Sequence, residues 1–178
     1  CEWFDLDHLT KSPAQFNPEK LAWLNNHYIR HCDDARLAAL AMPQLIRDGA
    51  RFEGAPALQE VIALLKDRAN TVNELADAAM LFYREPQPDP QLMAQHLTDV
   101  ARSALIQFAE QAQQVEWTKE ALAALIKKVI TEHALKMPQL AMPLRLLVTG
   151  QLQTPSVDAV LALLGRQVVL ERLAPHLK

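Results

Sequence analysis

Apolar residues return at every third or fourth position along most of this chain, and that spacing predicts α-helices with one buried face. In the segment 55–66 the inward positions are Leu58, Val61, Ile62 and Leu65. In the segment that begins near residue 118 they are Leu122, Leu125, Ile126 and Val129. No window alternates Val, Ile and Thr with polar residues at period two, so we expect no sheet. The pattern therefore predicts an all-α fold.

Capping residues stand directly before several of these apolar stretches. We expect helix N-caps at Asn17, Asp33, Thr71, Asp89 and Thr118. Thr71 and Glu74 have the spacing of a capping box, in which two residues bond reciprocally to each other's backbone amides. Arg68 precedes this box and would project from the corner between two helices, near the positive end of the second.

The same periodicity assigns an inward face to each helix. In the first helix the expected inner stripe is Leu21, Leu24 and Tyr28. The second helix should break or kink at Pro43. Its inward residues are Leu37, Leu40 and Ala41. After Asp89 we expect one long helix whose inner face carries Met93, Leu97, Val100, Ala104 and Phe108.

Three prolines alternate with polar residues in the segment 85–90, which cannot continue a helix. We expect the chain to divide there into two consecutive helical bundles that together form an α-helical cage. The first bundle spans residues 1–85, the proline link 86–90, and the second bundle 91–178.

Composition narrows the function classes. The net charge of −3 argues against a protein that binds nucleic acid by charge alone, although a local basic patch is still compatible with it. Cys1 and Cys32 are too few for a disulfide framework, and no signal peptide or apolar run of membrane-spanning length occurs. We therefore expect a cytoplasmic protein without a membrane partner. Because residue 1 is Cys, we expect the chain to begin inside a longer protein.

Known catalytic motifs are missing from the sequence, which has no phosphate-binding glycine loop, nucleophile elbow or His-Glu-x-x-His pattern. His27 and His31 stand four residues apart beside Cys32, a spacing that suits two zinc ligands. No third ligand is evident, so we expect no metal and no catalytic residue here. A small helical metalloenzyme is the alternative that this spacing leaves open.

Recognition by arginine is the chemistry that the sequence favours. Arg145 lies in an apolar helical run that ends at Gly150. We expect Thr154 to cap the next helix, with Pro155 at its first position and Val157 on its buried face. A helix N-terminus beside a guanidinium suits phosphates and base edges. The simpler interpretation makes Thr154 and Pro155 a plain helix start and Val157 a core residue, with Arg145 paired to Asp158 or Glu171.

The first predicted helix carries a second face that could contact RNA, formed by Trp23, Asn26, His27 and Arg30. A half-buried tryptophan with a solvated polar rim would give the same pattern.

Two blocks of this sequence resemble bacterial glutamyl-tRNA synthetases. The first comprises Phe4-Asp5-Leu6 and then Lys20-Leu21-Ala22-Trp23-Leu24-Asn25-Asn26-His27-Tyr28-Ile29. The family has a lysine-leucine-x-tryptophan-x-asparagine-x-x-tyrosine-isoleucine pattern there. The second comprises Pro143-Leu144-Arg145, Thr149-Gly150 and Leu163-Leu164-Gly165, at spacings similar to those of the family's C-terminal end.

The resemblance implies an anticodon-binding segment that is not itself catalytic. The whole enzyme would attach glutamate to tRNA(Glu) with ATP and Mg²⁺ at an active site in the N-terminal catalytic domain. It implies that Arg68, followed by Asn70-Thr71-Val72, lies against the third anticodon base and favours cytosine. It also implies RNA contacts by Arg145, Thr154, Pro155, Val157, Lys20, Trp23 and Asn26.

Gln151, Asn26 and His27 depart from the residues common in that family, which bears on backbone contacts near Trp23. The expected partners are the tRNA(Glu) anticodon stem-loop and the N-terminal catalytic domain, in a monomer. The alternative of another class is a helical protein-interaction module with no RNA role.

Overall fold

The computed structural model describes residues 17–177, and every regular element in that range is helical. The first group comprises α1 (Pro18–His31), α2 (Asp34–Arg47), α3 (Leu58–Leu65), η2 (Lys66–Arg68), α4 (Val72–Ala79) and η3 (Met80–Phe82). The second comprises α5 (Pro90–His96), α6 (Asp99–Ala112), α7 (Lys119–Glu132), α8 (Met137–Thr149), α9 (Val157–Leu164), α10 (Arg166–Leu173) and η4 (Ala174–His176). The all-α prediction is confirmed. The Phe4-Asp5-Leu6 block lies outside the described residues.

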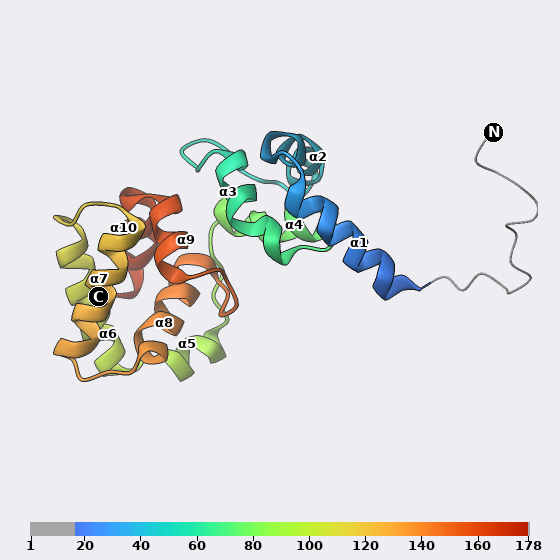
Figure 1. Ribbon diagram of the computed structural model, residues 1–178. Helices are drawn as coiled ribbons and strands as arrows, with labels where there is room; N and C mark the ends of the chain where they lie inside the picture. Colours follow the sequence, from blue (N-terminus) through green and yellow to red (C-terminus); the bar gives the residue numbers. More distant parts are fainter. Residues whose placement is uncertain (1–16, 178) are drawn as a thin grey trace, which may run out of the picture.

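The helices pack mainly within these two groups (Figure 1). α2, α3 and α4 contact one another, while α7 and α8 pack against α6 and α9. Residues 85–89 form no regular structure between the groups. The division at residues 86–90 stays a proposal that this irregular segment supports. Buried apolar residues nevertheless form one cluster from α1 to α10, because α3 of the first group touches α9 of the second.

The five expected N-caps are confirmed. The side chains of Asn17, Asp33 and Thr71 accept hydrogen bonds from backbone amides three residues later, at 3.1, 3.0 and 3.0 Å. Asp89 and Thr118 cap α5 and α7 in the same way. The capping box expected at Thr71 differs in one bond. The Glu74 carboxylate accepts from the amide of Asn70 at 2.8 Å and not from that of Thr71, one residue later. That bond draws the backbone after Arg68 onto the start of α4.

Two expectations about inward faces are wrong. Leu21, Leu24 and Tyr28 are 51%, 41% and 66% exposed, and α1 buries Ile29 instead. Leu40 is 54% exposed, because α2 turns Leu37, Ala38 and Ala41 inward. Of the break or kink expected at Pro43, the break is wrong, because α2 continues through Pro43 to Arg47.

The expected long helix after Asp89 is two helices. α5 ends at His96, and Thr98 caps α6 by accepting from the amide of Ala101 at 3.3 Å. Val100 falls in the first turn of α6 and is 52% exposed, although the expected stripe placed it inside. Among the described residues, none of the helices is long and apolar enough to span a membrane.

Gly150 ends α8 at a close approach between the groups. Its φ of +75° lies in the left-handed region, and a Cβ there would stand 3.2 Å from the backbone nitrogen of Gln87 in the link. Two requirements therefore select glycine at this position: a backbone conformation that other residues adopt at a cost, and the absence of a side chain beside Gln87.

We predict that Gly150→Ala destabilises the protein more than Gly49→Ala. Gly49 has a similar φ of +82° but nothing within 4 Å of its Cβ position, so it isolates the conformational cost, about 1–2 kcal/mol. Crowding against Gln87 should add about 1–3 kcal/mol at Gly150. Urea denaturation of both variants measures the difference, and equal losses would show that the approach of the link imposes no constraint.

Candidate nucleic-acid interface

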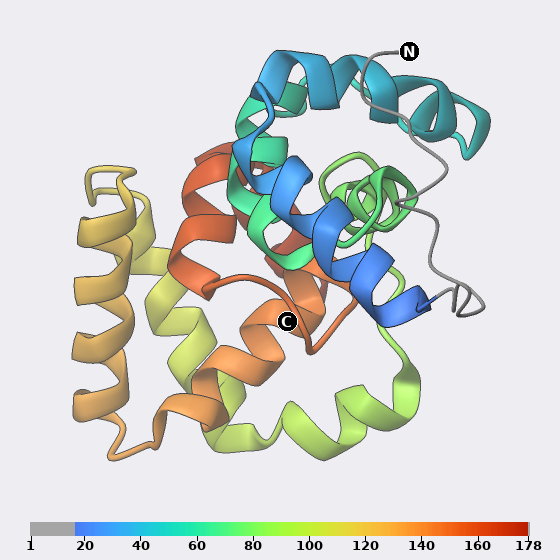
Figure 2. The ribbon, with the colours of Figure 1, turned by 45° about the vertical axis from the view of Figure 1, so that its right-hand side comes forward.

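The two helix groups meet where the sequence places its recognition residues. Arg68 is exposed at the end of η2, and its Nη1 donates to the backbone carbonyl of Thr154 at 3.1 Å. Thr154 belongs to the loop between α8 and α9, 86 residues further along the chain. Figures 1 and 2 show the two groups side by side. The fold thus brings the Arg68 corner onto the loop that follows Arg145.

Arg145 lies half-buried on α8, near the end of the helix that leads into that loop. Its Nε is buried and has no acceptor among the described residues. The Thr149 hydroxyl donates to the Arg145 carbonyl at 2.7 Å and accepts from the amide of Gln151 at 3.2 Å, which ties the end of α8 to the loop. Within residues 17–177 neither Arg68 nor Arg145 forms an ion pair, so the pairing of Arg145 with Asp158 or Glu171 is not seen.

Thr154 and Pro155 do not start a helix as expected. α9 begins at Val157 with Ser156 at the N-cap, and the Thr154 hydroxyl donates to the Pro155 carbonyl at 3.0 Å instead of capping an amide. Pro155 is buried and Val157 is 7% exposed, so both side chains pack inside the protein. Thr154 keeps a partly exposed side chain, and its carbonyl receives Arg68.

Polar residues of α1 hold the corner that carries Arg68. Asn26 is part-buried, and its amide donates to the carbonyl of Ala69 at 2.7 Å. Asn25 donates likewise to the carbonyl of Asn70, and Arg30 pairs with Asp67 at 3.2 Å. These bonds hold the backbone on both sides of Arg68, so α1 fixes the corner that presents the guanidinium.

Lys20 and Trp23 are exposed on α1, Trp23 by 65%. The Trp23 ring stacks on His27 with centroids 6.0 Å apart, and the His27 and His31 ring centroids lie 4.4 Å apart. The Nδ1 of His31 lies 2.7 Å from the carbonyl of His27. Within the described range no three side chains of His, Cys, Asp or Glu converge as a metal site would require.

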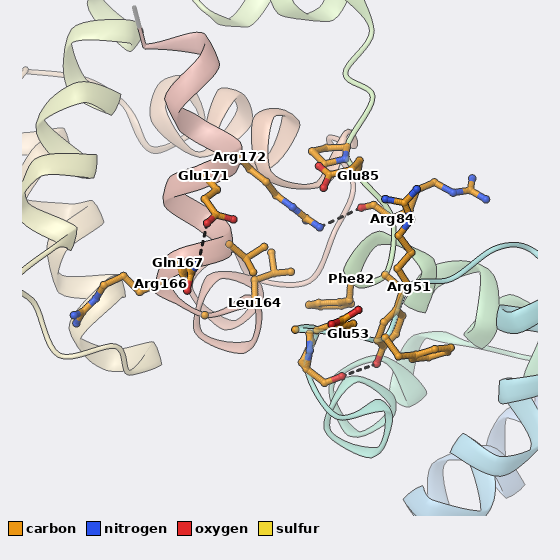
Figure 3. A pocket seen from close by; sticks show the side chains of 18 of the residues that line it. Arg51, Glu53, Phe82, Arg84, Glu85, Leu164, Arg166, Gln167, Glu171 and Arg172 are labelled. Carbon is orange, nitrogen blue, oxygen red and sulfur yellow. Dashed lines mark hydrogen bonds between the residues drawn. The ribbon is translucent and has the colours of Figure 1, made fainter.

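Arg172 on α10 makes a contact that the sequence did not indicate. Its Nη1 donates to the carbonyls of Val148 at 2.6 Å and Leu81 at 3.4 Å. Its Nη2 donates to the carbonyl of Arg84 at 3.1 Å (Figure 3). Val148 belongs to the second group and the other two to the first. Burial lowers the pKa of Arg172, while the Glu85 carboxylate opposes that shift. One guanidinium therefore fastens both groups, and no feature of apolar spacing distinguishes it from a solvated arginine.

Beside Arg172 the groups enclose an open cavity of about 1130 Å³. Its walls carry charges of both signs, and Figure 3 shows Glu53, Arg84, Glu85 and Glu171 around it with Arg172. The Glu171 carboxylate accepts from Gln167 at 2.9 Å. This mixed lining is not the uniformly positive surface that a polyanion requires.

A family model described as the anticodon binding domain matches residues 36–177. The chain belongs to this anticodon-binding domain family. The matched range contains Arg68, Arg145 and the α8–α9 loop that Arg68 contacts. The resemblance found in the sequence is thereby confirmed, and the protein-interaction alternative is not supported.

The relatives of this chain are longer proteins that it matches over part of their length. The chain is 66% identical over 176 residues to a glutamate–tRNA ligase of Janthinobacterium sp. (strain Marseille). It is 61% identical over 176 residues to that of Herminiimonas arsenicoxydans. Both alignments cover 99% of this chain but 38% of the relative. The chain therefore spans well under half of the length of these proteins.

Solved structures share the fold. The chain superposes with a TM-score of 0.83 on a glutamate tRNA ligase from Elizabethkingia meningosepticum, at 21% identity, covering 98% of this chain and 35% of that one. The glutamate-tRNA synthetase of Elizabethkingia anophelis gives a TM-score of 0.77 at 22% identity, covering 98% and 34%. At this identity the likeness establishes the helical architecture alone.

We predict that Arg172→Met lowers the free energy of unfolding by about 1.5–3 kcal/mol, because it removes a charged donor and leaves the carbonyls of its part-buried bonds, those of Leu81 and Val148, without this partner. Arg36→Met is the matched control, since Arg36 is exposed on α2. Urea denaturation measures both. An Arg172 variant as stable as the Arg36 variant would show that the three carbonyl contacts do not hold the groups together.

Proposed function

We propose that this chain is the anticodon-binding part of a glutamate–tRNA ligase, the enzyme that attaches glutamate to tRNA(Glu) with ATP. The observation that carries the proposal is the contact of Arg68 with the α8–α9 loop, inside the range that matches the anticodon-binding family. ATP and Mg²⁺ act in the catalytic domain of the longer enzyme, which is this segment's intramolecular partner. The whole enzyme is a cytoplasmic monomer in this proposal.

Arg68 is suited to reading a single-stranded base. A guanidinium has five N–H donors and no acceptor, and here one bond to the Thr154 carbonyl orients the fork while the side chain stays exposed. The remaining donors match the O2 and N3 acceptors of cytosine, whose Watson–Crick edge is accessible in an anticodon loop. We assign Arg68 to the third anticodon base, where cytosine separates glutamate from glutamine anticodons.

Arg145 supports the same assignment from the second group. A buried N–H without an acceptor costs about 1–3 kcal/mol, and the Nε of Arg145 is in that state. A phosphate or base edge that reaches the guanidinium supplies the missing acceptor once the side chain reorients. Binding then relieves a cost that the free protein carries, which makes Arg145 an RNA contact in this proposal.

The other assigned residues act in different ways. Thr154 holds Arg68 through its backbone carbonyl and keeps a partly exposed side chain, whereas buried Pro155 and Val157 set the path of the loop. Trp23 and Lys20 are exposed on α1 and offer a stacking surface and a cation to the RNA. Asn26 contributes by holding the corner through Ala69. The net charge of −3 leaves recognition to these local groups.

We predict that Arg68→Gln in the full-length enzyme weakens discrimination at the third anticodon base by about 1–3 kcal/mol, the scale of one bidentate base contact. Titration of tRNA(Glu) carrying cytosine, uracil or guanine at that position measures the ratio of dissociation constants. Arg47→Gln is the control, since Arg47 is a 72% exposed arginine on α2 that pairs with its neighbour Asp48.

The assignment fails if the unmutated enzyme binds the cytosine and uracil variants equally well. It also fails if Arg68→Gln lowers affinity for every variant by the same factor, because a phosphate contact carries no sequence information.

A further inference from the structure

Helix α1 presents an apolar stripe that nothing in the described chain covers. Leu21, Leu24 and Tyr28 follow one another at helical spacing and are 51%, 41% and 66% exposed. Along the same helix only Ile29 is buried. Three large apolar residues on one helix face predict a packed partner, since a stripe of this kind is what an amphipathic helix buries.

Helix α1 is attached to the rest of the described chain mainly by polar side chains. Asn25, Asn26 and Arg30 bond to the backbone or carboxylate of residues 67–70, and η2 is the main element that α1 contacts. In Figure 1, α1 extends away from the rest of the first group. A 14-residue helix is marginal in water without tertiary packing, so these bonds leave most of its apolar stabilisation to another surface.

The extent of the family match indicates where that surface belongs. The anticodon-binding family model begins at residue 36, after α1 has ended, yet the alignments with the relatives cover 99% of this chain. Those relatives extend far beyond it, because the chain makes up 38% of their length. Helix α1 therefore precedes the range that the family model matches, although the alignments with the longer relatives include it.

We propose that Leu21, Leu24 and Tyr28 form the docking surface for the part of the longer protein that precedes α1. The inference rests on the proposed function, since it takes the preceding part to be the catalytic portion of the ligase. Tyr28 carries a ring of the kind that stacks on bases, but Leu21 and Leu24 offer RNA neither a hydrogen-bonding nor a stacking group. The stripe as a whole therefore fits a protein surface. Trp23 lies on another side of the helix and stays available to tRNA, while Lys20, four residues before Leu24, stands at the edge of the stripe.

This surface has a consequence for the Arg68 corner. Helix α1 is packed on the preceding portion by its apolar stripe and bonded to the Ala69 and Asn70 carbonyls by Asn26 and Asn25. Helix α1 is thus the rigid element that connects the preceding portion with the Arg68 corner. The position of Arg68 is then set relative to the preceding portion through a single helix.

The test is thiol labelling of the full-length protein carrying Leu24→Cys, with Leu40→Cys as the matched control. Leu40 is 54% exposed on α2, within the range that the family model matches. Mass spectrometry of peptides identifies which cysteine reacts. Leu24→Cys should react roughly tenfold or more slowly than Leu40→Cys, because labelling of a covered thiol requires local opening. Tyr28→Cys is the second variant, for use if Leu24→Cys does not fold, and should be protected likewise.

Equal labelling rates at the two positions would overturn the inference. Protection that grows with protein concentration would also overturn it, because a second copy would then be the occupant, and so would protection that appears only when tRNA is added. Titration with anticodon variants, run on the same Leu24→Cys protein, keeps the two proposals apart. If the Leu24→Cys protein still discriminates between the anticodon variants but its thiol at position 24 reacts fast, the docking surface alone is rejected. If the unmutated protein does not discriminate between the variants, the proposed function is rejected.

Discussion

The arrangement of this molecule depends on the guanidinium of Arg172. It donates to carbonyls of Leu81 and Arg84 in the first helix group and of Val148 in the second. Apolar packing between α3 and α9 has little directionality, whereas three hydrogen bonds from one planar group fix an orientation. Burial lowers the pKa of Arg172, yet an arginine begins so far above neutrality that it stays charged and donating.

That orientation places the recognition residues against one another. Arg68 reaches the Thr154 carbonyl across the boundary between the groups, and Thr149 ties the same loop to the turn that carries Arg145. Gly150 lets the link pass close to the end of α8. The proposed anticodon-binding surface is thus composite, and neither group of helices contains both arginines. A change in the angle between the groups would separate them without altering either side chain.

Local signals in the sequence were sufficient for much of the fold. N-caps such as Asp33 and Thr118 act on amides three residues away, so neighbouring residues determine them. The stripe of Leu21, Leu24 and Tyr28 misled because periodicity reveals that a face needs cover, not which part of a protein covers it. In Thr154-Pro155-Ser156 two residues carry a hydroxyl suited to capping α9, yet neither side chain caps it. The tertiary bond from Arg68 to Thr154 lies outside any sequence window. Arg172 gave no signal, since its acceptors are backbone carbonyls, which every residue possesses.

In the function proposed for this chain, the η2 corner and the α8–α9 loop act as one anticodon-reading surface. Hydrogen exchange of the full-length protein tests this directly, with tRNA(Glu) and with the same tRNA carrying guanine as its third anticodon base. We expect amides of residues 66–71 and 150–156 to exchange more slowly together when tRNA(Glu) binds, and to be protected less by the guanine variant. Protection of only one segment, or the same protection by both RNAs, would contradict a shared reading surface.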